Sequence, residues 1–317
     1  MNFGKIAIVK PDHLGDLILS APAIRVLQER LACNEIDLFV SPHALKLGQF
    51  LFSDLAEQGL NLKTIVYPHL EKQNSDNLKL PLLEDYDSII SLRTDHLMTP
   101  DYFRAMAKRM HFQTQNENIH ETEIQKKCIL PVIGDYSIEE YFFKKTKNYQ
   151  KPKNISSIGL CISAGHSINS WSIYQWYDLA INLISKFNKK ICLIGGPAEH
   201  KELLILKKLL SLEDTQIIVG GSDFNKFGHD LESVDIIIAT DSGSAHICSL
   251  WKPIVSIFGP SPHFRFAPFG QFNKVISLNL SCSPCLQFSK THLNLCATKE
   301  CLNSVTINQV IQLLLHF

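Results

Sequence analysis

The sequence lacks the markers that identify several common classes of protein. It has no G-x-G-x-x-G segment and no P-loop, the usual signatures of dinucleotide-dependent redox enzymes and of phosphoryl transfer. No run approaches the roughly 20 apolar residues of a membrane-spanning helix. The first residues, "MNFGKIAIVKPDH", have neither the charged region nor the long apolar core of a signal peptide. We therefore expect a cytoplasmic protein, and contact with the inner membrane surface stays open.

An excess of charge of either sign is also absent. The chain has 31 Lys+Arg and 31 Asp+Glu, which gives a formal net charge of zero. Proteins that bind nucleic acid usually carry a basic surface, so nucleic acid is not expected as a partner. With 317 residues, 45% of them hydrophobic, the chain is long enough for two domains with buried cores.

Segments typical of strands and helices alternate along the chain. In the first half we expect strands at Lys5–Val9, Glu35–Val40, Lys63–Val66 and Ser88–Leu92, and helices at Asp16–Leu31, His43–Leu51 and Tyr102–Met110. The second half continues the alternation from "ISSIGLCIS" to a last helix, "TINQVIQLLLHF", after a lysine-rich linker, "FFKKTKNYQKPKN". This pattern predicts an α/β protein of two Rossmann-like domains, 1–150 and 151–317, with the ligand in the crevice between them.

An acidic residue, Asp16, follows a glycine where the first strand gives way to a helix. In open α/β sheets, ligands bind at the carboxyl ends of the strands, which makes Asp16 a candidate functional residue. The alternative is that Asp16 only caps the helix by accepting hydrogen bonds from its first N–H groups. The residues of this segment alone leave both interpretations open.

A second strand end, in "DIIIATDSGSAHICSLWKPIVSIFGPSP", suits an anion. Asp241, Ser242 and Gly243 follow a buried strand, and a helix begins near Ser244. Gly243 lets a phosphate approach the backbone, and the N–H groups of a helix start favour negative charge, with His246 as a further donor. The alternative is a capped helix that binds nothing.

Two further strand ends carry small polar residues. In "LIGGPAEH", the carboxylate of Glu199 can accept hydrogen bonds from ribose hydroxyls, or it can simply favour the start of a helix. The backbone and hydroxyls of "SAGHSINSW", which begins at Ser163, can hold a diphosphate. We expect Trp171 and Trp176 to pack in the core, with Trp171 lining a ligand pocket as the alternative.

The cysteines allow two interpretations. Cys161 and Cys192 lie within apolar strands and are expected to be buried reduced thiols. Near the end of the chain, four cysteines follow the spacing C-x2-C-x10-C-x4-C, which permits a structural zinc or iron site: Cys282, Cys285, Cys296 and Cys301. The alternative is a group of reduced thiols that packs a loop.

Together these stretches resemble glycosyltransferase family 9, the bacterial heptosyltransferases of lipopolysaccharide core assembly. The resemblance is strongest in "HLGDLILSAPAI", "GGPAEHKEL", "DSGSAHICSLWKPIVSIFGPSP" and "CSPC…CATKECLNSVTINQV". It implies the GT-B fold, in which two Rossmann-like domains face each other across a cleft. It also implies that residues 1–150 bind a lipopolysaccharide-core or other glycan acceptor and that residues 151–317 bind a nucleotide sugar, usually ADP-heptose. No cofactor is implied for the chemistry, and a zinc or iron would be structural only.

The resemblance assigns roles to the candidate residues. Asp16 corresponds to the catalytic base of an inverting transfer, and His13 is an alternative base because a helix start lowers the basicity of a carboxylate. The amides of Ser242–Ser244 would stabilise the charge that grows on the departing diphosphate. The donor-binding residues implied are Ser163, Glu199, Asp241, Ser242, Gly243 and His246.

The sequence departs from the family pattern beside Trp171. The family usually has a lysine two residues before this tryptophan and a proline just after it, where this chain has Asn169 and Ser172. Lys252, Arg265 and His166 are candidates to replace the missing cation. The departure leaves three alternatives open: a catalytically weak relative that binds nucleotide or glycan, a transferase for another nucleotide sugar, and a GT-B enzyme such as an epimerase.

Overall fold

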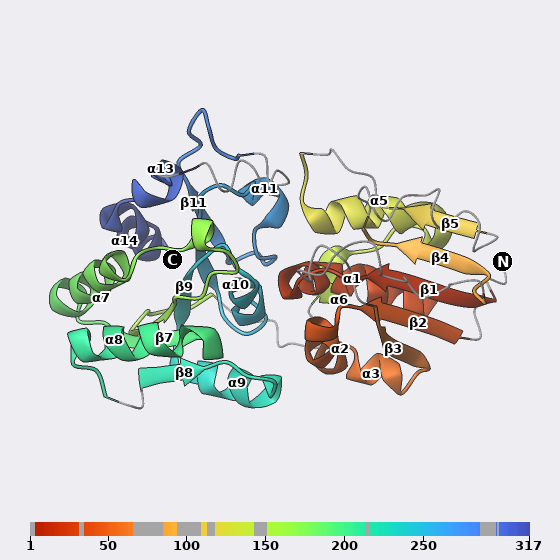
Figure 1. The fold of residues 1–317 in the computed structure, drawn as a ribbon, viewed down its shortest axis with the longest axis horizontal. Helices are drawn as coiled ribbons and strands as arrows, with labels where there is room; N and C mark the ends of the chain where they lie inside the picture. The colour runs from red at the N-terminus through yellow and green to blue at the C-terminus, as the bar shows by residue number, and fades with distance from the viewer. Residues whose placement is uncertain are drawn as a thin grey trace. The chain divides into compact units, whose positions relative to one another are not determined.

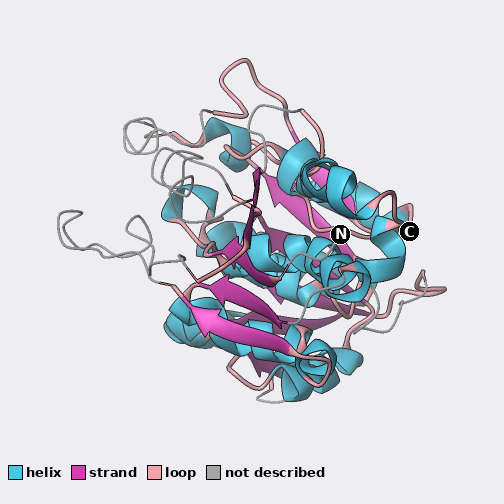
Figure 2. Ribbon diagram, turned by 90° about the vertical axis from the view of Figure 1, so that its right-hand side faces the viewer, coloured by secondary structure: helices cyan, strands magenta, loops and turns pink. Residues whose placement is uncertain are grey.

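Two parallel sheets, one in each half of the chain, organise the protein (Figure 1). The computed structural model describes residues 4–31, 35–65, 85–93, 109–112, 118–142, 151–213, 216–285, 296 and 298–317. The chain divides into two compact units, Met1–Lys145 and Thr146–Phe317. The predicted α/β GT-B fold class is confirmed, because each unit is a parallel sheet flanked by helices (Figure 2).

The sheet of the first unit has five strands in the order β3-β2-β1-β4-β5. All neighbours are parallel. The central strand, β1, reads Ile6–Val9 without a polar side chain, and none of these four residues is exposed. Such a continuous apolar run is typical of a parallel strand that is covered on both faces. The strands are β1 (Lys5–Lys10), β2 (Glu35–Val40), β3 (Leu60–Thr64), β4 (Ser88–Ser91) and β5 (Arg109–Phe112).

One long helix, α1, dominates the helical layer of this unit. Its residues Leu17–Leu27 are all buried, because α1 packs against the sheet on one side and against α5 and α6 on another. Arg25 is buried among them and forms an ion pair with Asp54 at 2.7 Å. The helices are α1 (Leu14–Arg30), α2 (Leu45–Leu51), α3 (Ser53–Ala56), α5 (Glu121–Ile133) and α6 (Ile138–Phe142), and the short 3-10 helix η1 (Pro42–Ala44) precedes α2.

The sheet of the second unit has six strands in the order β11-β10-β9-β6-β7-β8. The chain runs outward from β6 through β7 to β8 and then returns to the other side of β6 at β9. The loops that follow β6 and β9 therefore flank the topological switch point, where ligands of open α/β sheets bind. The strands are β6 (Ser157–Cys161), β7 (Lys190–Gly195), β8 (Ile217–Val219), β9 (Ile236–Thr240), β10 (Ile254–Phe258) and β11 (Lys274–Ser277).

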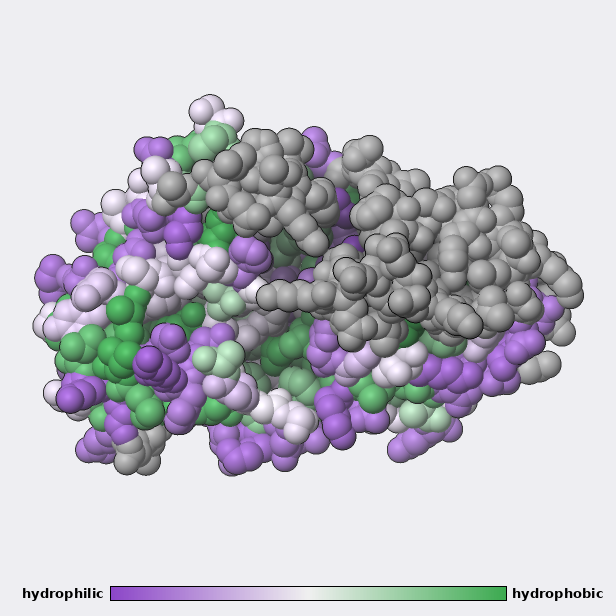
Figure 3. Space-filling view, viewed as in Figure 1, coloured by the Kyte–Doolittle hydropathy of each residue, from purple (hydrophilic) through white to green (hydrophobic). Residues whose placement is uncertain are grey.

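The helices of the second unit bury clear apolar faces. Ser172 and Gln175 form a capping box that begins α7, and Trp176 packs into the core from its first turn. Helix α8 also has apolar residues on its outer side, where Leu204 and Leu209 are exposed. Figure 3 shows hydrophobic surface in the region that α7 and α8 occupy in Figure 1. The helices are α7 (Ile173–Phe187), α8 (His200–Leu210), α9 (Phe224–Asp230), α10 (Gly243–Cys248), α11 (His263–Phe266), α13 (Glu300–Asn303) and α14 (Ile307–Leu315), with the 3-10 helices η3 (Ser167–Asn169), η4 (Pro197–Glu199) and η6 (Leu231–Ser233).

Several predicted elements are corrected. The helix expected at Tyr102–Met110 ends in residues that belong to β5, and its earlier part lies outside the described residues. The strand expected at Lys63–Val66 lies earlier, at Leu60–Thr64. Helices α5 and α6 were not predicted, because the apolar residues of α5 do not follow a clear helical period and α6 is only five residues long. Among the residues that the structure describes, no helix is both long and apolar enough to cross a membrane.

Candidate functional site

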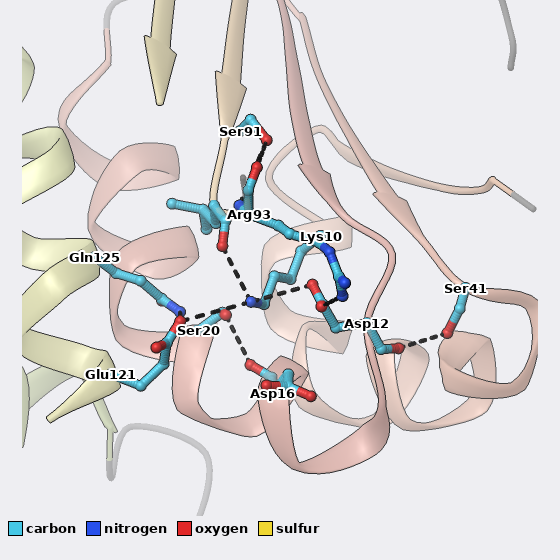
Figure 4. Close-up of polar contacts among 10 residues, drawn as sticks. Lys10, Asp12, Asp16, Ser20, Ser41, Ser91, Arg93, Glu121 and Gln125 are labelled. Carbon is cyan, nitrogen blue, oxygen red and sulfur yellow. Dashed lines mark hydrogen bonds and ion pairs between the residues drawn. The ribbon is translucent and has the colours of Figure 1, made fainter. Parts of the chain in front are cut away.

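The first group of predicted site residues lies at the carboxyl end of β1 (Figure 4). The N-cap of α1 is His13, whose side chain makes no capping hydrogen bond. Asp16 is the third residue of α1 and is half-buried, and its backbone carbonyl accepts a hydrogen bond from Ser20 Oγ at 2.7 Å. A carboxylate at this position is favoured by the helix dipole. The N-cap position of α1 is therefore occupied by His13, and Asp16 lies in the first turn.

The alternative base, His13, precedes the same helix. His13 is exposed, and its ring stacks on the ring of His43, with 6.2 Å between the ring centroids. His43 lies in η1, which follows β2, the neighbour of β1 in the sheet. Both candidate proton acceptors, Asp16 and His13, are thus found at the same edge of the first sheet.

Four charged side chains come together beside this loop, and we call them the β1 cluster: Lys10, Asp12, Arg93 and Glu121 (Figure 4). Lys10 Nζ lies 3.2 Å from Asp12 Oδ2 and 3.9 Å from Glu121 Oε1. The guanidinium of Arg93 pairs with Asp12 Oδ1. Sequence analysis missed this cluster because its members come from β1, the following loop, the end of β4 and the start of α5.

In the second unit, the ends of β6 and β7 bring two predicted residues together. Ser163 Oγ donates a hydrogen bond to Glu199 Oε2 at 2.8 Å. The backbone N–H of Gly196 donates to the same carboxylate oxygen at 2.8 Å and lies 3.2 Å from Ser163 Oγ. Ser163 is buried, and Glu199 is half-buried. The two hydrogen bonds to Oε2 therefore orient a carboxylate that is still partly accessible to solvent.

A cavity of about 570 Å³ opens beside Glu199, within the size range of small-molecule sites. Its apolar lining includes Trp171 and Trp176, which pack edge to face with 5.2 Å between ring centroids. Lys299 and Glu199 supply charge to its wall. Trp171 is 3% exposed and donates its Nε1–H to the carbonyl of Leu302, so it packs in the core, as predicted, and also lines the cavity.

The end of β9 carries the third group of predicted residues. Ser242 is the N-cap of α10, and its hydroxyl accepts a hydrogen bond from the N–H of Ala245 at 3.1 Å. The capping role proposed for this segment is therefore confirmed. Gly243 and Ser244 are the first two residues of α10, where helix geometry offers no intrahelical acceptor for the N–H groups. His246 is buried within α10 at 5% exposure.

Asn169, which stands in the place of the family's lysine, contacts the β9 loop. Its Nδ2 donates to Asp241 Oδ2 at 3.1 Å. From the other end of the sequence, Lys299 Nζ donates to the carbonyls of Ser167 and Ser170 at 3.1 and 3.3 Å. The turn that carries Asn169 is thus braced by a cation from the C-terminal segment. Sequence analysis missed Lys299 because its partners lie far away along the chain.

The three predicted replacements for the missing lysine lie in different places. Lys252 lies two residues before β10, at the amino end of the sheet, so it is at the wrong edge for a ligand held by the β6 and β9 loops. Burial lowers the pKa of Lys252, and the nearby Asp235 and Glu232 oppose that change. Arg265 in α11 stacks over Phe266, with Cζ 4.8 Å from the ring centroid. His166 is exposed and accepts the N–H of Ile168 at the start of η3.

The cysteines of the described part of the chain are free thiols, and Cys161 and Cys192 are buried as predicted. In the C-terminal group, burial and then the neighbouring thiols raise the pKa of Cys285 and of Cys301. Within the described residues, which include all four of these cysteines, no group of three or more His, Cys, Asp or Glu side chains is arranged to hold a metal ion.

Two parallel α/β units with polar groups at the carboxyl ends of their strands define a protein of the GT-B class. Solved structures with the same fold include a family 9 glycosyl transferase from Veillonella parvula, with a TM-score of 0.67, 17% identity, and coverage of 100% of this chain and 99% of that one. The E. coli heptosyltransferase WaaC with ADP has a TM-score of 0.64 and 14% identity over 98% of this chain and 99% of its own.

The model of glycosyltransferase family 9 (heptosyltransferase) matches residues 86–295. The chain belongs to this family and is therefore a glycosyltransferase. Among curated proteins, it is similar to lipooligosaccharide heptosyltransferase 2 of Campylobacter jejuni serotype O:6. The two are 24% identical over 301 residues, which cover 89% of this chain and 90% of the relative.

Proposed function

We propose that the protein is an inverting heptosyltransferase that moves a heptose from ADP-heptose to an acceptor of the lipopolysaccharide inner core. Membership of family 9 supports the class of reaction, and the similarity to a lipooligosaccharide heptosyltransferase supports the donor and the acceptor. The first unit would bind the acceptor, at the inner face of the membrane, and the second unit would bind the donor.

The observation that carries the proposal is the convergence of polar groups at the carboxyl ends of β6, β7 and β9. Ser163 and the Gly196 amide orient the carboxylate of Glu199, which would accept hydrogen bonds from the ribose hydroxyls of the donor. Thr240 Oγ1, at the end of β9, contacts the carbonyl of Ser163 at 3.4 Å. The donor-binding residues proposed are Ser163, Glu199, Asp241, Ser242, Gly243 and His246.

In the proposed reaction, Asp16 is the general base. The acceptor hydroxyl attacks the anomeric carbon of the heptose, and its proton passes to the Asp16 carboxylate. The bond from the anomeric carbon to the diphosphate oxygen breaks on the opposite face, so the configuration inverts and ADP leaves with the bonding electrons. The amides of Gly243 and Ser244 would stabilise the negative charge that develops on the diphosphate. No step in this proposal requires a cofactor.

A second candidate, a relative that binds nucleotide without transfer, is favoured by one contact. Where the family has a lysine for the phosphates, Asn169 donates to Asp241, so a neutral amide stands in place of a cation. Under this candidate, ADP would bind to the wild-type protein, and sugar would not be transferred to any acceptor.

The test begins with the wild-type protein and a set of ADP-, UDP- and GDP-sugars. A ligand that binds the folded state stabilises it by about 2.7 kcal/mol at a concentration of 100 times its dissociation constant, so thermal shift reports binding. We expect a shift with ADP-sugars only, followed by transfer of heptose to truncated lipopolysaccharide in a discontinuous assay. A shift with UDP-sugars only would replace the donor, and binding without transfer would establish the second candidate.

A further inference from the structure

A lysine that is almost completely buried connects the candidate base loop with two other segments of the first unit. Lys10 is the last residue of β1 and is 2% exposed. Besides its contacts with Asp12 and Glu121, its ammonium donates to the carbonyl of Leu92 at 3.0 Å (Figure 4). Lysine is rarely buried unless it is paired. A single side chain therefore ties the ends of β1 and β4 to the start of α5.

Three oxygen atoms of Asp12 make polar contacts with other segments of the first unit. Its two carboxylate oxygens face Lys10 and Arg93, and its backbone carbonyl accepts a hydrogen bond from Ser41 Oγ at 2.8 Å. Ser41 follows β2, so the contacts of Asp12 reach three strand ends. Only His13 separates Asp12 from the first residue of α1. The contacts of Asp12 with Lys10, Arg93 and Ser41 therefore restrict the loop between β1 and α1.

The β1 cluster is balanced in charge, with two cations and two anions. Gln125, one turn into α5 and fully buried, adds a hydrogen bond from its Nε2 to Glu121 Oε1 at 3.3 Å. Replacing a buried ion pair by apolar residues of similar volume is often neutral or stabilising, so stability alone does not explain such a group. In some proteins such buried charges fix one arrangement of the surrounding segments, because each charge accepts few alternative partners.

We propose that Lys10 is a positioning residue for the transfer reaction: through Asp12, it fixes the start of α1 and hence the place of the Asp16 carboxylate. The inference rests on the proposed role of Asp16. Catalytic groups must be held to within about 0.5 Å, and a displacement of about 1 Å can lower a rate about a hundredfold. The contact between Lys10 and Asp12, two residues before the first residue of α1, would supply this precision, and neither side chain would need to touch the substrate.

The test uses a charge-balanced pair of substitutions and a matched control in the same sheet. Lys10→Met with Glu121→Gln removes one charge of each sign and leaves the Asp12–Arg93 pair. The control, Lys63→Met with Asp37→Asn, removes another ion pair, at 2.5 Å, whose carboxylate is fully buried. Asp37 is opposite Ala7 in the register of the sheet, away from the loop that carries Asp16.

We expect the Lys10/Glu121 variant to lose at least tenfold in kcat, with ADP affinity within twofold of the wild type. The control variant should lose a similar number of degrees in melting temperature and keep kcat within twofold. Equal kcat losses in the two variants, or an unchanged kcat in the Lys10/Glu121 variant, would overturn the positioning role. If the double variant does not fold, Glu121→Gln alone should lower kcat in the same direction by a smaller factor, and an unchanged kcat would then be the contrary result.

The outcome is separable from the fate of the proposed function. A wild-type protein that transfers no sugar contradicts the proposed function, and this inference with it. A wild-type protein that transfers sugar, together with a Lys10/Glu121 variant that transfers it equally well, contradicts only the inference.

Discussion

The carboxyl edges of the two sheets are built from different chemistry. In the first unit, the β1 cluster holds the loop after the central strand with buried ions, and both Lys10 and Asp12 are less than 5% exposed. In the second unit, single charged groups meet neutral partners instead, as when Ser163 and the Gly196 amide donate to the carboxylate of Glu199. The difference suits the two tasks proposed for the edges: the first would place a proton acceptor accurately, and the second would receive a ligand that carries negative charge.

The energetics of the two edges differ in the same way. Removing one partner from a buried ion pair costs about 3–5 kcal/mol, because it leaves an uncompensated charge. Hydrogen bonds between a neutral and a charged group, such as those to Glu199, are worth about 1.5–3 kcal/mol each. We therefore expect single substitutions to lower stability more at the first edge than at the second.

The largest effect is expected at Asp16, the proposed general base of the first edge. Asp16→Asn should lower the transfer rate by about 10²–10⁴-fold, because a positioned general base contributes a factor of this size. The rate is measured at saturating donor and acceptor. Glu123→Gln is the matched control, since Glu123 is the third residue of α5 as Asp16 is of α1, and it is exposed. A rate loss shared by Glu123→Gln would point to helix stability rather than proton transfer.

The next effect is expected at the donor edge. Glu199→Gln should weaken ADP binding by about tenfold or more, because a hydrogen bond to a charged group is worth about 1.5–3 kcal/mol. At saturating donor, the transfer rate should stay within a few-fold of the wild type. Isothermal titration with ADP measures the change, and Glu213→Gln, an exposed acid beyond the end of α8, is the control. An unchanged ADP affinity in Glu199→Gln would remove the carboxylate from the donor site.

A smaller effect is expected at the braced turn. Lys299→Met should weaken ADP binding by up to about fivefold, the range of a partly exposed charge interaction. Adding Asn169→Lys should restore the affinity, since it returns a cation to the turn. Lys252→Met, at the other edge of the sheet, is the control. An equal loss of ADP affinity in Lys252→Met and Lys299→Met would show that the net charge of the protein, and not the turn, determines the affinity.

The smallest effect concerns stability away from both edges. Burial raises the pKa of Asp235, but four hydrogen bonds from Ser156 and Ser157, at 2.8–3.0 Å, outweigh burial, and the pKa lies below its usual value. A lowered pKa stabilises the fold above the unfolded-state value of about 3.9, and this stability is lost as the pH falls through the folded-state pKa. Asp235→Asn should therefore lower the melting temperature slightly at pH 7, and the difference should vanish at acid pH. A difference that grows on acidification contradicts this.

The sequence predicted those features whose signal is local. Alternating apolar segments indicated the two parallel sheets, and glycine-containing strand ends located Ser163, Glu199 and Ser242, two of which are in direct contact. The β1 cluster and Lys299 were missed for a common reason. Lys10 contacts Leu92 and Glu121 only because β1 lies beside β4 and α5 begins at the same edge of the sheet. The residues near Lys10 in the sequence do not reveal this arrangement.

The central claim is that the two edges divide the work, with chemistry at the first and donor binding at the second. The most direct test is the affinity of ADP for Asp16→Asn, measured by isothermal titration calorimetry beside the wild type. The division of work predicts dissociation constants that agree within twofold. A loss of ADP affinity of tenfold or more in Asp16→Asn would show that this carboxylate belongs to the donor site and would contradict the claim.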